Sequence, residues 1–450
     1  MKDFTSGNAG RQIVLFSLPM LIGNLFQHLY SMADAVVVGR YVNGTALAAV
    51  GMGINISNFL LAALIGLATG ASVVISQFYG ARQHGRIERT VSTSIVFFAG
   101  FSVIVSIIGI VGSPFLLRWL NTPQAILADA TIYLRVLMGG MIFTVFFNMY
   151  TAYLRALGDS RSPLYILVFC TLFNVALDLL FVIYFEMGVL GVAVATVIAQ
   201  AISAILCFVY VGRNVPLLKV TRMAFEWDLF RAILKYGSPA ALQLSLVSLA
   251  NLTITRLINS FGAATMAGIT AATKIDQLAI MPVGNVSMAL STFVAQNMGA
   301  GQEARAKKGF RLSLLFMVAL AVGISGLLIV FGPQLVSLFL NQDDVYREDI
   351  LRVGLEYLNI IVAFYFLFAF LFAFNGFFRG VGDAVIAMVF PVGSLTIRTV
   401  SAYLLADFAG MGSNSLAWSI PVGWGMCSLA SWFYYRKRLW VGKLVIRTAK

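Results

Sequence analysis

Long runs of apolar residues, separated by short hydrophilic gaps, dominate the chain. The run "ISNFLLAALIGLATGASVVIS" at 56–76 is typical. Strands of a transmembrane barrel would alternate apolar and polar residues, whereas unbroken runs of about 20 apolar residues are typical of spanning helices. The pattern therefore predicts an all-α polytopic membrane protein with twelve transmembrane helices, at 12–38, 46–78, 90–120, 130–157, 162–185, 188–212, 231–260, 265–297, 308–340, 350–377, 384–409 and 412–436.

The composition excludes a water-soluble or disordered protein. Of the 450 residues, 60% are hydrophobic and 11% are charged, against about 25% charged residues in soluble domains. The net charge of +13 would suit nucleic acid, but most Lys and Arg residues lie in the gaps between apolar runs. These gaps fall mainly on the cytoplasmic side if the N-terminus is cytoplasmic, which is the usual bias of membrane proteins. We therefore expect both termini in the cytoplasm and no nucleic-acid partner.

The cysteines and the N-terminal residues point to no further feature. Cys170, Cys207 and Cys427 lie inside apolar runs, so we expect neither a disulfide framework nor a metal site made by them. Residues 1–11 are polar and lack the pattern of a removed signal peptide. The apolar run that follows is therefore interpreted as the first span.

The two halves of the chain resemble each other. Pro19 recurs as Pro239, "ISQFYGARQHGR" at 75–86 recurs as "VAQNMGAGQEAR" at 294–305, and "YLRALGD" at 153–159 recurs as "FFRGVGD" at 377–383. Six spans per repeat is an even number, so the halves are parallel repeats about an axis along the membrane normal. We expect two pseudo-symmetric six-helix lobes, at 1–215 and 216–450, with a cytoplasmic linker at about 213–230 and a central cleft between the lobes.

A buried acid is predicted in the first span. Asn24, Gln27, Ser31 and Asp34 share one helical face, and Tyr30 flanks it. A carboxylate inside a span costs about 2.5–3.5 kcal/mol at the helix centre, so it is a functional candidate. The alternative is an acid near the end of the span that snorkels to the interface or pairs with Arg40. Pro19 lacks a backbone N–H and should bend this helix upstream of the acid.

A second acid is predicted in the fifth span. Thr171, Asn174 and Asp178 share one face there, although Asn174 could simply make a hydrogen bond between packed helices. Two acids in a low dielectric cannot both stay charged without a counter-ion. Oxygen atoms of Thr196 in the sixth span and of Asn148 in the fourth could help to hold a small alkali cation. The pair is therefore a candidate site for a proton or a sodium ion.

The second half lacks this pair of acids. The repeat places Thr253 or Ile254 opposite Asp34, and Arg398 opposite Asn174. Arg398 could pair with Asp407, lie near the cleft, or lie at the end of its span, and these three alternatives stay open. The aromatic run at 364–380 could bind bulky apolar or cationic compounds, or it could face lipid or neighbouring helices.

Two short motifs lie at the ends of these spans or in the gaps between them. The linker mixes basic and aromatic residues, as in "TRMAFEWDLFR" at 221–231; it could lie in the membrane interface or be a plain loop. The Arg-x-x-Gly-Asp turns at 155–159 and 379–383 bring opposite charges together and are expected to brace the fold.

The motifs resemble those of the multidrug and toxic compound extrusion (MATE) family of secondary antiporters. The resemblance covers the whole chain and rests on several segments: Pro19 with "YSMADAVVVGR", "ISQFYGA", "YLRALGDSRSP", "NVALDLLF", "ATKIDQLAIMPVG", "VAQNMGAGQEARA" and "FFRGVGD". It implies two six-helix bundles that form a V-shaped cleft, and exchange of an exported compound for protons or sodium.

The resemblance also implies roles for individual residues. Asp34 would be the acid of the first helix and Pro19 its bending proline. The cation-coupling residues would be Asp34, Asn174, Asp178 and Thr196, with Gln27, Tyr30 and Asn148 lining the same cavity. Some branches of the family also use acids in helices 7 and 10, which this chain lacks, so coupling through the first lobe is favoured.

We therefore expect a secondary antiporter that exports amphipathic or cationic organic compounds by alternating access, with H⁺ or Na⁺ as the coupling ion. It would be a monomer in the plasma (inner) membrane of a prokaryote and would need no cofactor. A flippase or exporter of a lipid-linked oligosaccharide is the alternative, although it should need a basic cleft. An intramembrane enzyme is disfavoured, because no nucleophile constellation or zinc motif is visible.

Overall fold

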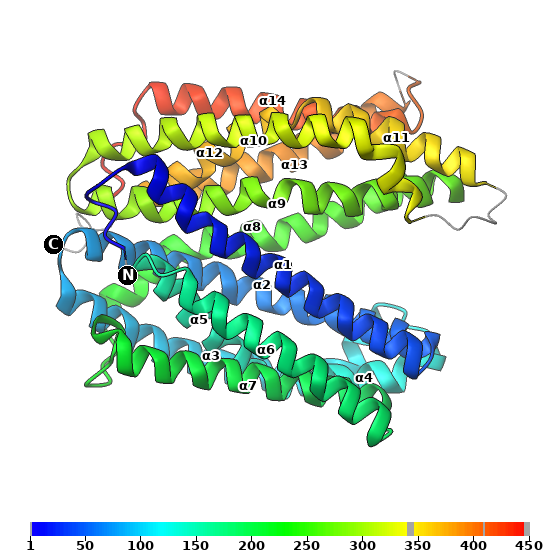
Figure 1. The fold of residues 1–450 in the computed structure, drawn as a ribbon, viewed down its shortest axis with the longest axis horizontal. Coiled ribbons are helices and arrows are strands. Elements are labelled where there is room, and N and C mark those ends of the chain that lie inside the picture. Colours follow the sequence, from blue (N-terminus) through cyan, green and yellow to red (C-terminus); the bar gives the residue numbers. More distant parts are fainter. Residues whose placement is uncertain (1, 340–345, 408–409, 445–450) are drawn as a thin grey trace. The chain divides into compact units, whose positions relative to one another are not determined.

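All regular elements in the described part of the chain are helices (Figure 1). The structure is a computed structural model that describes residues 2–339, 346–407 and 410–444. The elements are α1 (Ala9–Tyr41), α2 (Gly44–Gly80), α3 (His84–Trp119), α4 (Gln124–Gly139), α5 (Met141–Ala156), α6 (Arg161–Leu179), η1 (Leu180–Tyr184), α7 (Gly188–Asn214), η2 (Pro216–Leu218), α8 (Trp227–Asn259), α9 (Ala263–Gly299), α10 (Glu303–Ser337), α11 (Arg347–Ala363), α12 (Tyr365–Val381), α13 (Ala384–Asp407) and α14 (Asn414–Arg436). The predicted all-α class is confirmed.

Eight of the described helices are long and apolar enough to cross a membrane. Two further spans form when the bent pairs α4–α5 and α11–α12 are each taken as one, with bends of 50° and 52°. The remaining two of the twelve predicted segments correspond to α8 and α14, which are less apolar. The spans expected at 130–157 and 350–377 are therefore each interrupted by a bend, after Gly139 and after Ala363.

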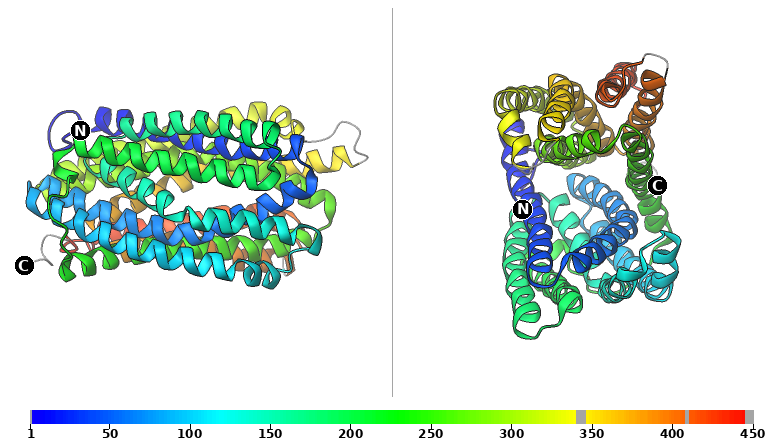
Figure 2. Two further views of the ribbon diagram at one scale, coloured as in Figure 1. Left: turned by 90° about the horizontal axis from the view of Figure 1, so that it is seen from below. Right: turned by 90° about the vertical axis from the view of Figure 1, so that its right-hand side faces the viewer.

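The helices pack into two units, each of which has its own core. Residues 2–3 and 18–241 form the first unit, and residues 4–17, 242–339, 346–407 and 410–444 belong to the second. The division therefore differs from the expected boundary at 215 and 216. The first turns of α1 belong to the second unit, and the first half of α8 belongs to the first unit. Within each unit the helices run roughly alongside one another (Figure 2).

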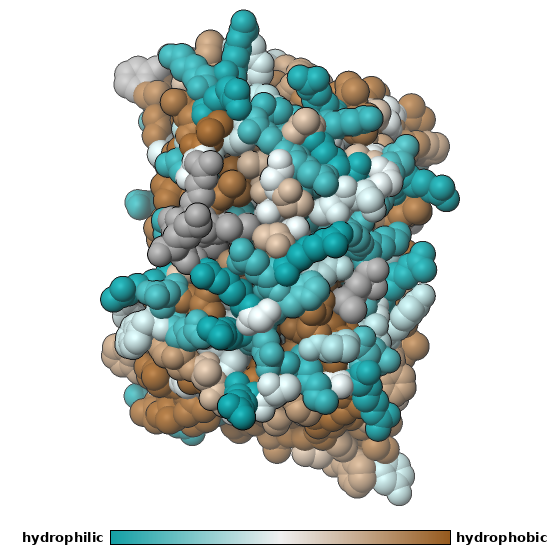
Figure 3. Space-filling model, turned by 90° about the vertical axis from the view of Figure 1, so that its left-hand side faces the viewer, coloured by the Kyte–Doolittle hydropathy of each residue, from teal (hydrophilic) through white to brown (hydrophobic). Residues whose placement is uncertain are grey.

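Apolar side chains cover the flanks of both units, as a bilayer requires. Val111 and Phe115 of α3 are 73% and 71% exposed, and Leu315 of α10 is 69% exposed. Hydrophilic side chains instead gather on the end face shown in Figure 3. Contiguous apolar surface of this kind marks contact with lipid, so the chain is a multi-pass membrane protein.

Small residues allow close helix packing in the first unit. Gly66 and Gly70 of α2 face Gly237 and Ala241 of α8, and a Cβ atom added at either glycine of α2 would overlap the backbone of α8. Two small residues spaced four apart on each helix let the backbones approach closely. This contact joins the first half of α8 to the first unit.

The segment before α1 is anchored in the second unit. Phe4 is fully buried against Phe293 and Phe16. Its N–H donates to Gln296, and its carbonyl accepts from Arg305 Nε at 3.0 Å. The chain that leads into the first helix thus packs on helices of the other sequence half.

The linker before α8 is likewise docked, on α3 of the first unit. Ala224 donates to the hydroxyl of Ser92 at 2.7 Å, and Thr221 donates to the carboxylate of Glu88 at 2.9 Å. Phe225, meanwhile, packs against Trp227. The linker therefore has a defined packing role on α3.

The acids of the two Arg-x-x-Gly-Asp turns hold their neighbouring helices in place. Asp159 accepts from the backbone of Ser162 at the start of α6 and from the hydroxyl of Tyr210 in α7 at 3.1 Å. Asp383 accepts from Tyr434 in α14 at 2.6 Å. No ion pair of the described residues joins either acid to the arginine of its own motif. The turns brace the fold through tyrosine hydroxyls and a helix N-terminus instead.

Candidate functional site

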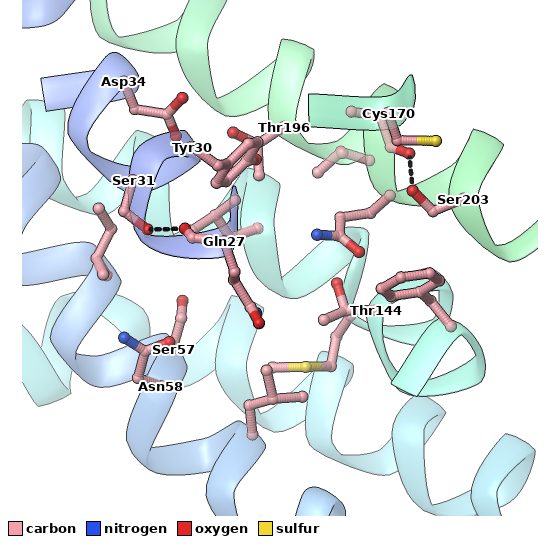
Figure 4. A pocket seen from close by; sticks show the side chains of 18 of the residues that line it. Gln27, Tyr30, Ser31, Asp34, Ser57, Asn58, Thr144, Cys170, Thr196 and Ser203 are labelled. Carbon is pink, nitrogen blue, oxygen red and sulfur yellow. Dashed lines mark hydrogen bonds between the residues drawn. The ribbon is translucent and has the colours of Figure 1, made fainter. Parts of the chain in front are cut away.

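A cavity of about 160 Å³ lies inside the first unit. Side chains of α1, α2, α4, α5, α6 and α7 line it (Figure 4). Its polar lining residues are Gln27, Tyr30, Ser31, Asp34, Ser57, Asn58, Tyr133, Thr144, Asn148, Thr171, Thr196, Gln200 and Ser203. A polar cavity of this size has room for several water molecules or for an ion with part of its hydration shell.

Both predicted acids are buried within this unit. Asp34 is 1% exposed, while Asn174 and Asp178 are fully buried. Asp34 lines the cavity, and Asp178 is near enough to interact directly with its carboxyl group. No ion pair of the described residues joins Asp34 to Arg40, and the burial of Asp34 favours the functional interpretation over snorkelling to the interface.

The amide of Asn174 bridges the two acids. When its nitrogen is oriented towards the carboxylates, it donates to Asp34 Oδ1 and to Asp178 Oδ2, each at 3.1 Å. This orientation is assigned from the hydrogen-bond network, because the opposite one would place only acceptors against each other. Asn174 and Asp178 lie on the same face of α6. Asp34 reaches the same amide group from α1. The three residues form one connected cluster.

Several buried oxygen atoms beside this cluster have no hydrogen-bond partner among the described residues. They are Tyr30 Oη, Thr171 Oγ1, Asp178 Oδ1 and Thr196 Oγ1. Tyr30 and Thr196 lie next to each other and near Asp34 (Figure 4). Carboxylate and neutral oxygens are the ligands that a hard cation prefers. The donor set fits a proton or a small alkali ion, whereas no group of three or more His, Cys, Asp or Glu side chains in the described residues could hold a metal.

The structure places the other predicted residues as follows. Gln27, Tyr30, Asn148 and Thr196 line the cavity. Asn148 also donates to the carbonyl of Thr144 at 2.8 Å. Helix α1 continues through Pro19 without a break, so a bend at this proline stays a prediction.

Sequence reasoning missed part of the lining. Ser57, Asn58, Gln200 and Ser203 were not singled out, although all line the cavity. Sequence reasoning started from the two helical faces that carry an acid and added only Thr196 and Asn148 from other spans. Ser57 and Asn58 could have been found from the sequence, because they are two polar residues next to a long apolar run.

A comparison with known protein families shows to which family this chain belongs. The family model MatE matches residues 19–180 and 239–404, one match in each half of the chain. The chain belongs to the MatE family. MatE (MATE) proteins are membrane transporters, so the resemblance seen in the motifs is confirmed.

Individual relatives cover nearly the same length. A probable multidrug resistance protein of Bacillus subtilis, YpnP, is 29% identical over 440 residues, which is 97% of each chain. A probable multidrug resistance protein of Thermotoga maritima, NorM, is 27% identical and covers 89% of this chain and 87% of its own. A solved structure described as an outward-facing multidrug resistance MATE family transporter shares the fold, with a TM-score of 0.90, 22% identity, and coverage of 97% and 98%.

Proposed function

We propose that this MATE transporter exports amphipathic cationic organic compounds in exchange for H⁺ or Na⁺. The observation that carries the proposal is the cluster of Asp34, Asn174 and Asp178, buried beside a cavity in the first unit. The relatives named as probable multidrug resistance proteins support the class of substrate. Asp34 and the aromatic side chains of Tyr30 and Tyr133 give the cavity the lining that an organic cation prefers.

Exchange follows if the coupling cation and the substrate compete for the same negative charge. Burying two carboxylates without a positive partner is costly, so the cluster should always hold a proton, a metal cation or a cationic substrate. When H⁺ or Na⁺ binds, the charge that attracts the substrate is neutralised and the substrate leaves. When the ion is released on the other side, the cluster can bind substrate again. Thr196 and Tyr30 would complete the oxygen ligands for Na⁺.

The gradient of the coupling ion provides the energy for this exchange. When one cation enters and a neutral substrate leaves, the charge that moves through about 100 mV releases about 2.3 kcal/mol, which corresponds to roughly a 40-fold substrate gradient. When one monovalent cationic substrate leaves for each ion that enters, no net charge moves, and the concentration gradient of the ion drives export. The inward gradient of the coupling ion sets the direction of export. We place the protein in the plasma (inner) membrane of a prokaryotic cell as a monomer, with both termini in the cytoplasm as the charge bias predicts.

No observation favours the flippase alternative. A lipid-linked pyrophosphate would need basic side chains, and none of the residues that line the cavity is Lys or Arg. We therefore keep the antiporter as the single proposed function.

We expect efflux of a cationic dye such as ethidium from cells that make this protein to depend on an ion gradient. An uncoupler, or the removal of sodium, should abolish dye export, since the proposed step needs an inward-moving cation. The rate of loss of dye fluorescence from loaded cells measures it. Export that persists after both gradients are collapsed would contradict the proposal.

A further inference from the structure

The second unit holds a polar cluster inside the membrane that the proposed coupling site does not use. Asp276 of α9 accepts a hydrogen bond of 2.7 Å from the hydroxyl of Tyr365 in α12. Arg398 of α13 is close enough to Asp276 and to Tyr357 of α11 to interact electrostatically with both. Charged side chains within spans are costly and mark functional sites.

The cluster lies near the middle of the span. Tyr365 is the first residue of α12 and follows the bend between α11 and α12. Both helices have 17 residues, so the bend divides the span into equal halves. A lipid headgroup lies at the membrane surface and would not reach this depth.

The internal repeat places this cluster where the first unit has its coupling site. Helices α2 and α9 both have 37 residues. When they are aligned from their first residues, Asp276 occupies the position of Ser57, which lines the first cavity. In the alignment that pairs the two Arg-x-x-Gly-Asp turns, Arg398 occupies the position of Asn174, which bridges the two acids. The same place in the fold thus carries a guanidinium in one unit and an amide between carboxylates in the other.

Arg398 has hydrogen-bonding capacity that the described residues do not use. Its guanidinium stays charged and offers five N–H donors. No ion pair in the described part of the chain includes Arg398, and its Nε is buried without a hydrogen-bond partner there. Asp276 supplies a nearby negative charge, but one of its oxygens already accepts from Tyr365. The guanidinium is therefore available to an external acceptor, and a carboxylate matches its planar fork.

A group of aromatic rings extends from Tyr365, whose hydroxyl donates to Asp276. The rings of Tyr365 and Trp424 are 6.3 Å apart, and those of Phe368 and Trp424 are 5.2 Å apart. Phe372 continues the group, at 4.1 Å from Phe368. Such rings bind flat aromatic molecules by offset or edge contacts.

We propose that Arg398 and this aromatic group bind the carboxylate end of a flat aromatic substrate within the second unit. The proposal rests on the proposed export function and extends its substrates to aromatic compounds that carry a carboxylate. Asp276 partly neutralises Arg398 while no ligand is bound, and its negative charge opposes the ligand's carboxylate. The two charged residues should therefore have opposite effects on binding.

The test compares two dyes that differ only in this group: rhodamine 110, which has a free carboxylate, and rhodamine 123, its methyl ester. Fluorescence anisotropy gives the affinity of each for the purified full-length protein. Arg398→Gln should weaken binding of rhodamine 110 by about tenfold to 100-fold, as expected for a lost charge-assisted hydrogen bond, and leave rhodamine 123 nearly unchanged. Asp276→Asn should strengthen binding of rhodamine 110. Arg352→Gln, the same change at an exposed position of α11, should alter neither affinity.

Other results would overturn the proposal. Equal losses for both dyes, or weaker rhodamine 110 binding in both charge variants, would make Arg398 and Asp276 an internal structural pair. Failure of the wild-type protein to bind rhodamine 110 would also contradict it. If Arg398→Gln does not fold, Arg398→Lys decides, because it keeps the charge without the planar fork and should give an intermediate loss for rhodamine 110 alone. The binding assay needs no ion gradient. If the variants still affect the two dyes differently but the protein exports no substrate, only the proposed function is contradicted.

Discussion

Replacing Asp34 or Asp178 with asparagine should abolish gradient-driven efflux. Each change keeps the shape of the side chain but removes one of the two charges that share Asn174. The cluster could then rest without a cation, so cation binding would no longer be tied to substrate release. The substrate gradient that the coupling ion sustains should therefore fall to that of cells without the protein.

The control for these variants is Asp228→Asn, the same chemical change at an exposed position at the start of α8. It should leave efflux unchanged, and all three variants should reach the membrane in similar amounts. Full efflux by Asp34→Asn would remove Asp34 from the mechanism, and the same holds for Asp178→Asn.

Gly70→Leu should destabilise the first unit severely. A side chain at this position would meet the backbone of Gly237 in α8, and backbone atoms cannot move aside as a flexible side chain can. Overpacking typically costs about 1–3 kcal/mol and sometimes more, so we expect a large fall in the melting temperature or no folded protein. Gly70→Ala should show the same effect in milder form. Melting of the purified protein, followed by circular dichroism, measures the change.

Gly100→Leu in α3 is the matched control, because a Cβ added there would meet no other atom within 4 Å. Leucine has a higher helix propensity than glycine by about 0.5–1 kcal/mol, so this variant should be as stable as the parent or slightly more stable. Equal stability of Gly70→Leu and Gly100→Leu would show that α2 and α8 do not pack as described.

Much of the fold could be predicted because the bilayer imposes simple rules. Long apolar runs must be helices, and the recurring motifs revealed the repeat before any coordinates. The bends were not predictable in the same way. The α4–α5 bend has a sequence signal in Gly139 and Gly140, but the equivalent bend after Ala363 lies in an aromatic run without glycine or proline. Packing around that helix, rather than its own residues, must determine where it bends.

The division into units was also beyond the sequence. Hydropathy shows where a helix spans but not which neighbours it contacts, so it could not show that residues 4–17 cluster with the second unit. Tertiary contacts such as those of Phe4 with Phe293, Gln296 and Arg305 reveal this arrangement.

The coupling cluster was the most predictable part of the site. The spacing in α6 placed Asn174 and Asp178 on one face, and the cost of a buried charge singled out Asp34. The sequence could not show that one amide joins both acids, because that contact is between helices. Asp276 was overlooked even though it lies well inside the predicted span 265–297, since the prediction favoured the helices where the family carries acids. The depth of an acid within its predicted span would have been a better criterion for choosing candidate residues.

The most direct test of the central claim is cation movement into proteoliposomes that contain the purified transporter, with H⁺ and Na⁺ gradients imposed separately. We expect substrate inside the vesicles to accelerate the entry of one of the two ions, and the substrate to leave in a fixed ratio to it. This coupled flux should be lost in Asp34→Asn. Substrate movement that is unaffected by either gradient, or coupled flux that persists without both carboxylates, would contradict the account.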